Sequence, residues 1–499
     1  MVSPEDAESP AGWESDEPRS QSESENPPEE QQSSGFGRSL LRETATYSAG
    51  VAGAALIGFV AVPVYTRVIG PTGYGDVALA LAIVAPLSAI ANLGLDVALS
   101  RHWFDSGRDR KDVATSLLAF AGMWSALLTV LGAVLIAAAA TLDVLPPVLP
   151  PLLLITLAAL LPTQLFTHAL QLLRNEFRPT AYVIVSLVAA LTGTSVGVAL
   201  VVTGVLGAPG PLVGVVVTGV AGCALALPLT RRFLCGRVTW AAFAPLLRLG
   251  APLVPASLAF WVFSGFDRIV IGALAPWELP GYSVAAQIVL PLGLVVTAIG
   301  QAWVPRIVQR HATDPEYAGR AIVLGTELVL AGFAVIAAVA GLLAPQLIGI
   351  IAGPGYESGI APLPLLATAT VMLGTSVLTA TGSLLALKTA RTPLITIAAA
   401  VIDVAALLWL VPRWGGVGAG VALLMAYSLM LWLTLAYSQS VFRLPFRLLR
   451  LVILWFGVVV QAVLAAVAPG SPQAWLAAAW PVAWCVWVAV SLRRDAASH

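Results

Sequence analysis

Charged side chains are scarce in this sequence. Asp, Glu, Lys and Arg together make up 10% of the 499 residues, whereas 58% are apolar. A soluble globular protein carries roughly 25% charged residues, because its surface faces water. The composition therefore excludes a water-facing surface over most of the chain. Lysine occurs only at Lys111 and Lys388, and neither follows a glycine. The Gly-Lys pair of a P-loop is thus missing, which excludes nucleotide hydrolysis by that route.

Cysteine is almost as rare as lysine. Cys223, Cys235 and Cys485 are scattered through apolar sequence, and no CxxC or Cys/His spacing occurs. Such a pattern predicts neither a disulfide framework nor a zinc site. We therefore expect no metal, no cofactor and no nucleic-acid partner.

The first 36 residues lack the basic and apolar regions of a cleavable secretory signal. They contain ten acidic residues and a single base, Arg19. A segment so rich in Ser, Pro and Glu cannot bury a hydrophobic core. We predict that residues 1–36 form a disordered acidic cytoplasmic tail.

The rest of the chain consists of apolar stretches of about 20 residues, the length needed to cross a hydrocarbon core of ~30 Å as a helix. A transmembrane barrel would show alternating segments of about 10 residues instead. We therefore predict an all-α integral membrane protein with about 14 transmembrane helices. The predicted spans are 44–66, 77–100, 113–141, 148–172, 180–205, 208–230, 246–272, 282–304, 320–344, 359–387, 393–411, 415–439, 449–468 and 474–492.

The basic residues give an independent test of this count. With the N-terminus placed inside, 23 of the 26 lysines and arginines fall in inner segments, as the cytoplasmic loops of membrane proteins favour. The exceptions are Arg67, Arg268 and Arg413. If one helix were miscounted, all later loops would be assigned to the wrong side of the membrane, and the basic residues would no longer gather on one side. We therefore predict a multi-pass protein of the cell membrane with both termini cytoplasmic.

A short internal repeat divides the chain. Arg67-Val-Ile-Gly70 is followed by Gly73-Tyr74, and Arg268-Ile-Val-Ile-Gly272 is followed by Gly281-Tyr282. The two copies are separated by six predicted helices, so they share the same membrane orientation, as the parallel halves of some transporters do. The pattern predicts two six-helix lobes, 37–240 and 241–440, followed by an additional helix pair with a short cytoplasmic C-terminus, 441–499.

Several segments resemble the polysaccharide and O-antigen flippases of the multidrug/oligosaccharidyl-lipid/polysaccharide exporter superfamily. They include PVYTRVIGPTGYGDVALA (63–80), GAPLVPASLAFWVFSGFDRIVIGAL (250–274) and VPRWGGVGAGVA (411–422), and the similarity covers roughly residues 38–440. This resemblance implies two lobes around a central cavity that opens alternately to each side. It also implies movement of an undecaprenyl-diphosphate-linked oligosaccharide from the inner to the outer leaflet. The acidic tail departs from the family pattern.

Ionisable residues within a membrane face a cavity or a partner, which makes them candidate functional residues. The repeat-related Arg67 and Arg268 suit a pyrophosphate, because a guanidinium is always charged and donates bidentate hydrogen bonds. We predict that they contact the substrate, with Asp267 beside Arg268. Gln287 and Gln301 are candidates for binding sugar hydroxyls. Each arginine has an alternative role as a structural anchor, and for Arg268 this is a local pair with Asp267.

Three acidic residues are candidates for coupling transport to a proton or sodium gradient. Asp403 is isolated in AAAVIDVAALLW, Glu327 is nearly as isolated, and Asp96 lies near the inner end of its span. A carboxylate in such a place is able to exchange a cation with a gradient. For Asp96 a local ion pair with Arg101 is the alternative, and for the others polar packing against a neighbouring helix.

Three functions remain in competition. The first is a flippase for cell-surface polysaccharide, such as lipopolysaccharide or exopolysaccharide, with the lipid-linked oligosaccharide, membrane lipid, a polysaccharide polymerase and glycosyltransferases as partners. The second is a cation-coupled multidrug exporter of the same fold, which would favour acidic residues in its cavity. The third is a membrane-embedded glycosyltransferase or polymerase. Such enzymes need sizeable outer loops, whereas the longest here, 275–281 and 345–358, contain no base. We predict a transporter and not an enzyme.

Overall fold

The computed structural model describes residues 29–104, 109–469 and 471–497, with side chains between residues 46 and 487 except at a few helix positions. The chain divides into two compact units, Met1–Arg42 and Glu43–His499. In the first unit, residues from Glu29 onward are helical. Residues 1–28 of the predicted acidic tail lie outside the described residues. The second unit contains the remainder of the fold.

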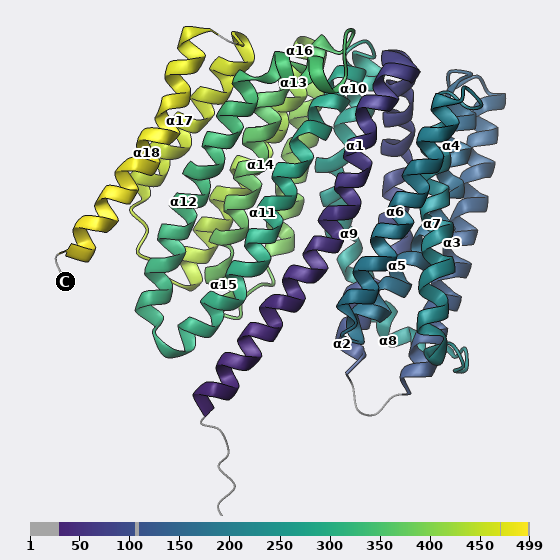
Figure 1. Cartoon of the computed structure of the whole chain (residues 1–499), viewed down its shortest axis with the longest axis horizontal. Coiled ribbons are helices and arrows are strands. Elements are labelled where there is room, and N and C mark those ends of the chain that lie inside the picture. Colours follow the sequence, from purple (N-terminus) through teal and green to yellow (C-terminus); the bar gives the residue numbers. More distant parts are fainter. Residues whose placement is uncertain (1–28, 105–108, 470, 498–499) are drawn as a thin grey trace, which may run out of the picture. The chain divides into compact units, whose positions relative to one another are not determined.

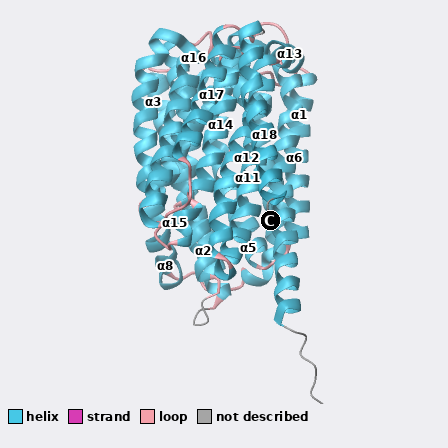
Figure 2. Ribbon diagram, turned by 90° about the vertical axis from the view of Figure 1, so that its left-hand side faces the viewer, coloured by secondary structure: helices cyan, strands magenta, loops and turns pink. Residues whose placement is uncertain are grey.

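The described residues form helices and no strands (Figure 2). The helices are α1 (Glu29–Asn92), α2 (Leu95–His102), α3 (Arg110–Thr141), α4 (Leu149–Ala158), α5 (Leu160–Asn175), α6 (Pro179–Val202), α7 (Pro209–Thr230), α8 (Trp240–Gly250), α9 (Val254–Trp261), α10 (Asp267–Leu274), α11 (Leu279–Thr313), α12 (Pro315–Leu342), α13 (Ala344–Ile351), α14 (Pro362–Thr379), α15 (Thr381–Leu385), α16 (Thr392–Val441), α17 (Leu448–Val467) and α18 (Pro472–Ala497). Short helical turns lie at Arg231–Phe233, Ala251–Leu253, Val262–Phe266 and Glu357–Gly359.

Two long helices are each divided by a glycine. Gly70 in α1 has φ 79°, and Gly415 in α16 has φ 53°, a left-handed conformation that glycine adopts without steric cost. Pro71 then opens the second half of α1, as proline favours the first helical position. The Glu278 carboxylate accepts a hydrogen bond of 2.6 Å from Gly416 N and thereby caps the second half of α16. Each long helix thus supplies two spans.

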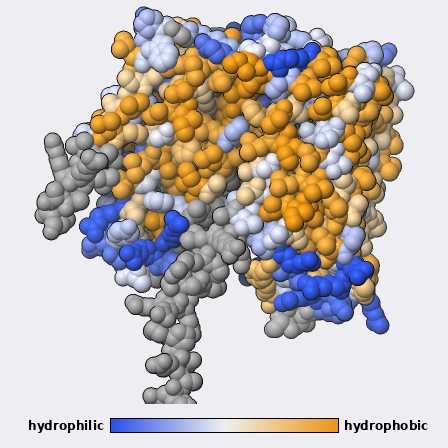
Figure 3. Space-filling model, viewed as in Figure 1, coloured by the Kyte–Doolittle hydropathy of each residue, from blue (hydrophilic) through white to orange (hydrophobic). Residues whose placement is uncertain are grey.

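The fold confirms the predicted class. Eleven helices among the described residues are long and apolar enough to cross a membrane. Counting the halves of α1 and α16 separately and including α18 gives fourteen segments, one for each predicted span. Figure 3 shows apolar side chains over the middle of the visible face, with hydrophilic residues toward its upper and lower edges. This pattern is the one expected of a multi-pass protein surrounded by lipid.

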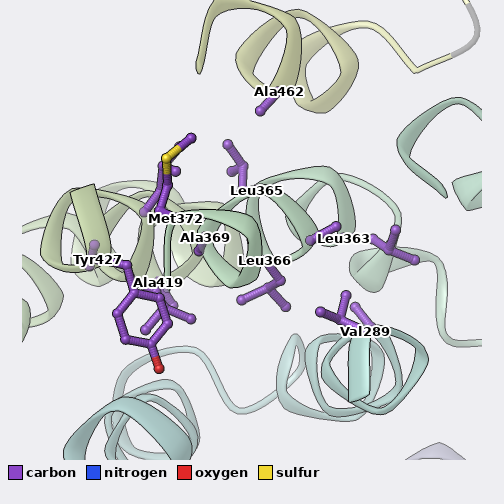
Figure 4. Close-up of a cluster of buried hydrophobic side chains, with 14 of the residues drawn as sticks. Val289, Leu363, Leu365, Leu366, Ala369, Met372, Ala419, Tyr427 and Ala462 are labelled. Atoms are coloured by element: carbon purple, nitrogen blue, oxygen red, sulfur yellow. The ribbon is translucent and has the colours of Figure 1, made fainter. Parts of the chain in front are cut away.

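The helices gather into two lobes, and the core of the C-terminal lobe extends to Val62 and Tyr74 of α1. Three apolar clusters lie in the N-terminal lobe, among α1 to α8, and include Leu117, Leu153 and Ala189. The main C-terminal cluster is centred on α14, which is buried on nearly all sides. Figure 4 shows side chains of α14 directed toward Val289 of α11, Tyr427 of α16 and residues of α17. Small residues such as alanine at these contacts allow membrane helices to approach closely.

The segment between the lobes is broken into short pieces. Phe243 and Leu246 of α8 belong to a core cluster of the N-terminal lobe, whereas α9 and α10 contact α16 in the C-terminal lobe. The helical turns Ala251–Leu253 and Val262–Phe266 interrupt the predicted span 246–272. The additional helix pair, α17 and α18, lies beside α12 (Figure 1).

Candidate functional site

A cavity of about 490 Å³ lies between the two lobes. Its walls come from both halves of α1, from α6 and α7, and from α10, α11 and the turn Val262–Phe266. Most of the lining is apolar or small. The polar lining residues are Tyr65, Tyr74, Thr194, Thr218, Ser264, Arg268, Ser283 and Gln287. Arg268 is the one charged side chain among the described residues that line this cavity.

A π-helical turn positions Arg268. Val262–Phe266 forms this wider turn directly before α10, and such turns occur frequently at functional sites. The turn brings Ser264 and Gly265 to the cavity wall together with Arg268. Arg268 Nη1 donates to Ser264 O at 2.5 Å and to Asp267 Oδ1 at 3.4 Å. Within the described part of the chain, Nη1 makes all the hydrogen bonds of this guanidinium, so Nε and Nη2 are free to bind an anion.

Asp267 is a buried partner of Arg268 and not a lining residue. Its side chain is 7% exposed. Oδ1 accepts from Arg268 N at 2.7 Å, and Oδ2 accepts from the hydroxyl of Tyr282 at 2.5 Å. The predicted alternative, a local pair between Arg268 and Asp267, is therefore present in the structure. Because both carboxylate oxygens have donors, Asp267 fixes the guanidinium in place from behind.

The structure separates the two glutamines that the sequence suggested. Gln287 of α11 lines the cavity. Gln301 lies further along the same helix, but its side chain falls outside the described residues. Sequence reasoning missed Tyr65 and Ser283 as lining residues. Tyr65 lies within the segment that carried the family resemblance, and Ser283 directly follows the Gly281-Tyr282 pair of the repeat, so each residue had a different signal in the sequence.

Arg67 is not among the lining residues, although the repeat places it opposite Arg268. Its guanidinium donates to Pro63 O at 2.9 Å, to Ile351 O at 3.2 Å and to Ile350 O at 2.5 Å. Ile350 and Ile351 close α13, whose last carbonyls have no partner within the helix. The two arginines therefore do not meet in one cavity in this structure, and Arg67 joins the lobes at one end of it.

We call this region the Gly70 end, defined by Gly70, the loop 275–278 and the loop 352–356. Three further contacts join the lobes there. Tyr356 OH donates to Thr66 O at 2.9 Å, and the rings of Tyr74 and Tyr356 meet edge to face with centroids 6.1 Å apart. Gly355 lies against Pro71. The cavity is therefore closed toward the Gly70 end.

Of the three acidic candidates, Asp96 lies in the first turn of α2. Its Oδ1 accepts from Asn92 Nδ2 at 3.0 Å. The ion pair with Arg101 that the sequence suggested as an alternative is not found among the described residues. Asp403 of α16 is 1% exposed, and its Oδ1 has no hydrogen-bond partner among the described groups. It lies close enough to Asp267 for their charges to interact.

Glu327 is isolated in the sequence but not in the structure. Its Oε2 accepts from Arg450 Nη2 of α17 at 3.2 Å. The Arg450 guanidinium in turn lies 4.1 Å from the ring centroid of Trp487 in α18. The alternative that the sequence offered for Glu327, polar packing against a neighbouring helix, is therefore present in the structure, with a partner 123 residues away in the chain. The pair connects the additional helices to the C-terminal lobe.

We expect Glu327→Gln to destabilise the protein through this contact. Removing one partner of a buried ion pair lowers the free energy of unfolding by roughly 3–5 kcal/mol. Because the Arg450 side chain is 25% exposed, we expect a loss of about 3 kcal/mol or less here. Thermal unfolding in detergent micelles would measure the loss. The matched control is Glu316→Gln, at an exposed position of the same helix. The double variant Glu327→Gln/Arg450→Gln tests the pair itself. If its loss of stability equals the sum of the losses of the two single variants, the ion pair contributes nothing to stability.

The chain matches one protein family and is similar in structure to several solved proteins. A family model described as polysaccharide biosynthesis protein matches residues 40–311, more than half of the chain. Comparison with curated proteins gives no match. The lipid II flippase MurJ, in an inward closed conformation, is 11% identical, with a TM-score of 0.67 over 90% of this chain and 99% of that chain. A variant of the Vibrio cholerae MATE transporter VcmN is 14% identical, with a TM-score of 0.55 over 84% and 99%.

A multidrug resistance MATE transporter of the MOP superfamily, in an outward-facing conformation, is 17% identical, with a TM-score of 0.54 over 84% of this chain and 96% of that chain. At these identities the structural similarity shows a common fold. The two-lobe arrangement and the predicted resemblance agree with the family match. This chain belongs to the polysaccharide biosynthesis protein family.

Proposed function

We propose that this protein is a flippase that moves a polyprenyl-diphosphate-linked oligosaccharide from the inner to the outer leaflet for cell-surface polysaccharide synthesis. The observation that carries this proposal is the free edge of the Arg268 guanidinium at the wall of the inter-lobe cavity. A diphosphate is the part of the substrate that a fixed, permanently charged guanidinium recognises. Gln287, Ser264 and Ser283 provide polar groups beside it for sugar hydroxyls.

The cavity favours this function over export of cationic drugs. Its one charged lining side chain among the described residues is a cation, and Asp267 is covered by Tyr282 and Arg268. A cationic drug would meet the Arg268 charge without a facing carboxylate. The family match to polysaccharide biosynthesis points to the same substrate class. In this proposal the protein is not an enzyme, and the membrane-embedded transferase or polymerase is set aside.

The contacts at the Gly70 end support transport by alternating access. With both termini cytoplasmic, as the arginine distribution predicts, the Gly70 end faces outward. The contacts of Arg67 and Tyr356 then close the cavity to the outside in this structure. Export requires these contacts to break while others form at the inner end. The similar solved structures include one protein in an inward closed and another in an outward-facing conformation.

The direct test uses the purified protein in lipid vesicles. An undecaprenyl-diphosphate-linked monosaccharide carrying a fluorophore is placed in both leaflets, and a membrane-impermeant quencher is added outside. A flippase makes the inner-leaflet pool accessible, so fluorescence falls toward zero instead of stopping near one half. An accumulated cationic dye with no movement of the lipid-linked sugar would favour the multidrug alternative and overturn the proposal.

The proposed location is the cell membrane with both termini in the cytoplasm. A reporter that is active only outside the membrane, fused after Ser491, is therefore expected to be silent. The same reporter inserted within residues 469–473, where α17 leads into α18, is expected to be active, because the positive-inside arrangement of the chain puts this turn outside. The opposite pattern of activities would refute the topology and with it the direction of transport. A polysaccharide polymerase and glycosyltransferases are the proposed partners in the cell.

A further inference from the structure

A second cavity, which we call the side cavity, lies among α5, α6 and α7 of the N-terminal lobe and has a volume of about 330 Å³. These three helices pack against one another and lie side by side in Figure 1. The side cavity adjoins the central cavity between the lobes, because Val215 and Thr218 of α7 line both. Its volume is within the range of ~300–1,000 Å³ that small-molecule sites occupy. The central cavity therefore has an extension into one lobe that is large enough for a ligand.

Two glycines of α7 bring α5 close on this side of the lobe. A Cβ built on Gly219 would lie 2.9 Å from Thr163 N, and a Cβ built on Gly222 would lie 2.5 Å from the ring of Phe166. Small residues allow membrane helices to approach in this way. Because α5 and α7 touch at these two points, packing fixes the side chains of α5 that line the side cavity.

Polar side chains line the side cavity along one face of α5. Thr163, Thr167 and Gln171 follow one another at four-residue intervals, which places them in a row on the helix surface, and all three line the cavity. Polar groups inside a membrane face a cavity or a partner, because hydrocarbon offers them no hydrogen bonds. The pocket between α17 and α18 has the opposite character, since its lining consists almost wholly of apolar side chains such as Val452 and Leu476. The row on α5 therefore forms a surface for water or a polar ligand and not for lipid chains.

The row on α5 has unused hydrogen-bonding capacity. Gln171 Nε2 donates to Ser100 Oγ at 2.6 Å and to Asp96 O at 3.4 Å, which leaves Oε1 without a donor among the described groups. Thr167 Oγ1 donates to Thr163 O at 2.8 Å and keeps its lone pairs for an incoming donor. Thr163 Oγ1 is buried and has no partner within the described part of the chain. Buried polar atoms are nearly always paired, so the row suits a ligand that both donates and accepts, as a hydroxyl does.

The described residues that line the side cavity include aromatic rings and no charged side chain. The rings belong to Phe166 and Tyr182, and the Tyr182 ring meets that of Tyr47 edge to face at a centroid distance of 5.1 Å. An ionic ligand would have no counter-charge here, and burying an unpaired charge is costly. A neutral sugar combines hydroxyls with an apolar C–H face, so it suits a wall that combines polar groups with aromatic rings.

We propose that the side cavity is a carbohydrate subsite that binds the outer sugars of the lipid-linked oligosaccharide while the diphosphate lies at Arg268. The proposal rests on the proposed function and deepens it, because it divides recognition between the lobes. Arg268 belongs to α10, which packs in the C-terminal lobe, and it binds the charged end of the substrate. The N-terminal lobe binds neutral sugars through the row on α5. The sugar next to the diphosphate stays in the central cavity, and only a longer chain reaches the side cavity.

The side cavity extends toward the inner side of the membrane in the predicted topology. Tyr182 lies in the first turn of α6, directly after the turn at residues 176–178, which the arginine distribution places inside. The Gly70 end of the central cavity, in contrast, is closed by the contacts of Arg67 and Tyr356. The sugars of a substrate that arrives from the inner leaflet therefore meet the side cavity while the outer end is shut.

The first test measures binding to the full-length protein in lipid nanodiscs. The protein is titrated with undecaprenyl diphosphate that carries either one neutral hexose or a chain of four. Thr167→Trp fills the side cavity, so we expect the four-sugar lipid to bind about tenfold or more weakly, as the loss of one to two hydrogen bonds gives. The one-sugar lipid is expected to bind as it does to the wild type. Thr167→Val removes the hydroxyl and keeps the shape, and it is expected to weaken binding of the four-sugar lipid about fivefold.

Thr192 of α6 is the matched control position. It is exposed, its hydroxyl donates to Val188 O at 2.8 Å just as that of Thr167 donates to Thr163 O, and it lines neither cavity. Thr192→Trp and Thr192→Val are expected to bind both lipids as the wild type does. If Thr167→Trp does not fold, Thr167→Val still decides, because it keeps the shape of the native side chain.

The second test repeats the comparison in the vesicle assay. Thr167→Trp is expected to move the one-sugar lipid at the wild-type rate and the four-sugar lipid about tenfold or more slowly. If both Thr167 variants bind and move both lipids as the wild type does, the side cavity holds only water or lipid, and the subsite is refuted while the proposed function stands. An equal loss for both lipids would also overturn the subsite, because position 167 would then not distinguish the outer sugars. If binding of the four-sugar lipid depends on Thr167 but the wild type moves neither lipid, the proposed function fails while the subsite stands.

Discussion

Arg268→Ala is expected to abolish export of the lipid-linked oligosaccharide while the protein stays in the membrane at its normal level. Losing one partner of a desolvated charge pair costs about 3 kcal/mol or more, which corresponds to a loss of over about a hundredfold. The fold is expected to survive, because two donors to Asp267 remain: the hydroxyl of Tyr282 and the backbone N–H of residue 268. The measurement is surface polysaccharide in cells together with the quencher assay in vesicles.

Two further variants sharpen this result. Arg268→Lys is expected to restore only part of the export, since an ammonium is a point charge without the planar fork of a guanidinium. Arg413→Ala is the matched control, because this exposed arginine donates to Trp409 O and does not line the cavity. Its export is expected to match the wild type. Full export by Arg268→Ala would show that the anion-binding role assigned to this residue is wrong.

The fold could be predicted from the sequence because two independent signals agreed. The apolar stretches gave the number of spans, and the segregation of arginines fixed their alternation. The short repeat around Arg67 and Arg268 also located part of the cavity, since Arg268 lines it and Tyr74 lies on its wall. The repeat does not determine the direction in which each side chain points. The Arg67 guanidinium donates to backbone carbonyls of α13. Because every residue has a backbone carbonyl, a sequence does not show which of them will act as acceptors.

Long-range partners explain the remaining differences. Glu327 looked isolated because the sequence around it is apolar, whereas its partner Arg450 belongs to a helix that extends the two-lobe pattern. His168 is a lone histidine in an apolar stretch, which in a sequence gives no sign of a functional role. Only the structure shows that both its ring nitrogens lack hydrogen-bond partners among the described groups. In both cases burial and pairing decide the interpretation, and neither follows from the spacing of residues along the chain.

Replacing Arg67 is also expected to reduce export strongly, but for a different reason from the replacement of Arg268. Its guanidinium binds the carbonyls of Ile350 and Ile351 across the lobe boundary, at a helix C-terminus whose partial negative charge favours a cation. Each bond contributes about 1 kcal/mol at this exposed position. Losing both shifts the balance between closed and open at the Gly70 end by roughly thirtyfold. Arg67→Met keeps the apolar stem and removes the donors, so we expect the Gly70 end to open and export to fall by about tenfold or more.

The opening is measurable as a distance between spin labels at Val205 and Trp277, both exposed and on opposite lobes, in a background with the three native cysteines replaced. Arg67→Met is expected to populate longer distances, and the control Arg413→Met is expected to keep the wild-type distribution. An export defect with unchanged distances would assign Arg67 to substrate contact, as the repeat alone suggested. Unchanged export and unchanged distances would show that the bonds to α13 do not control the Gly70 end. Only a combined loss of closure and export supports Arg67 as the residue that holds this end shut, because a residue that merely binds substrate has no effect on the empty protein.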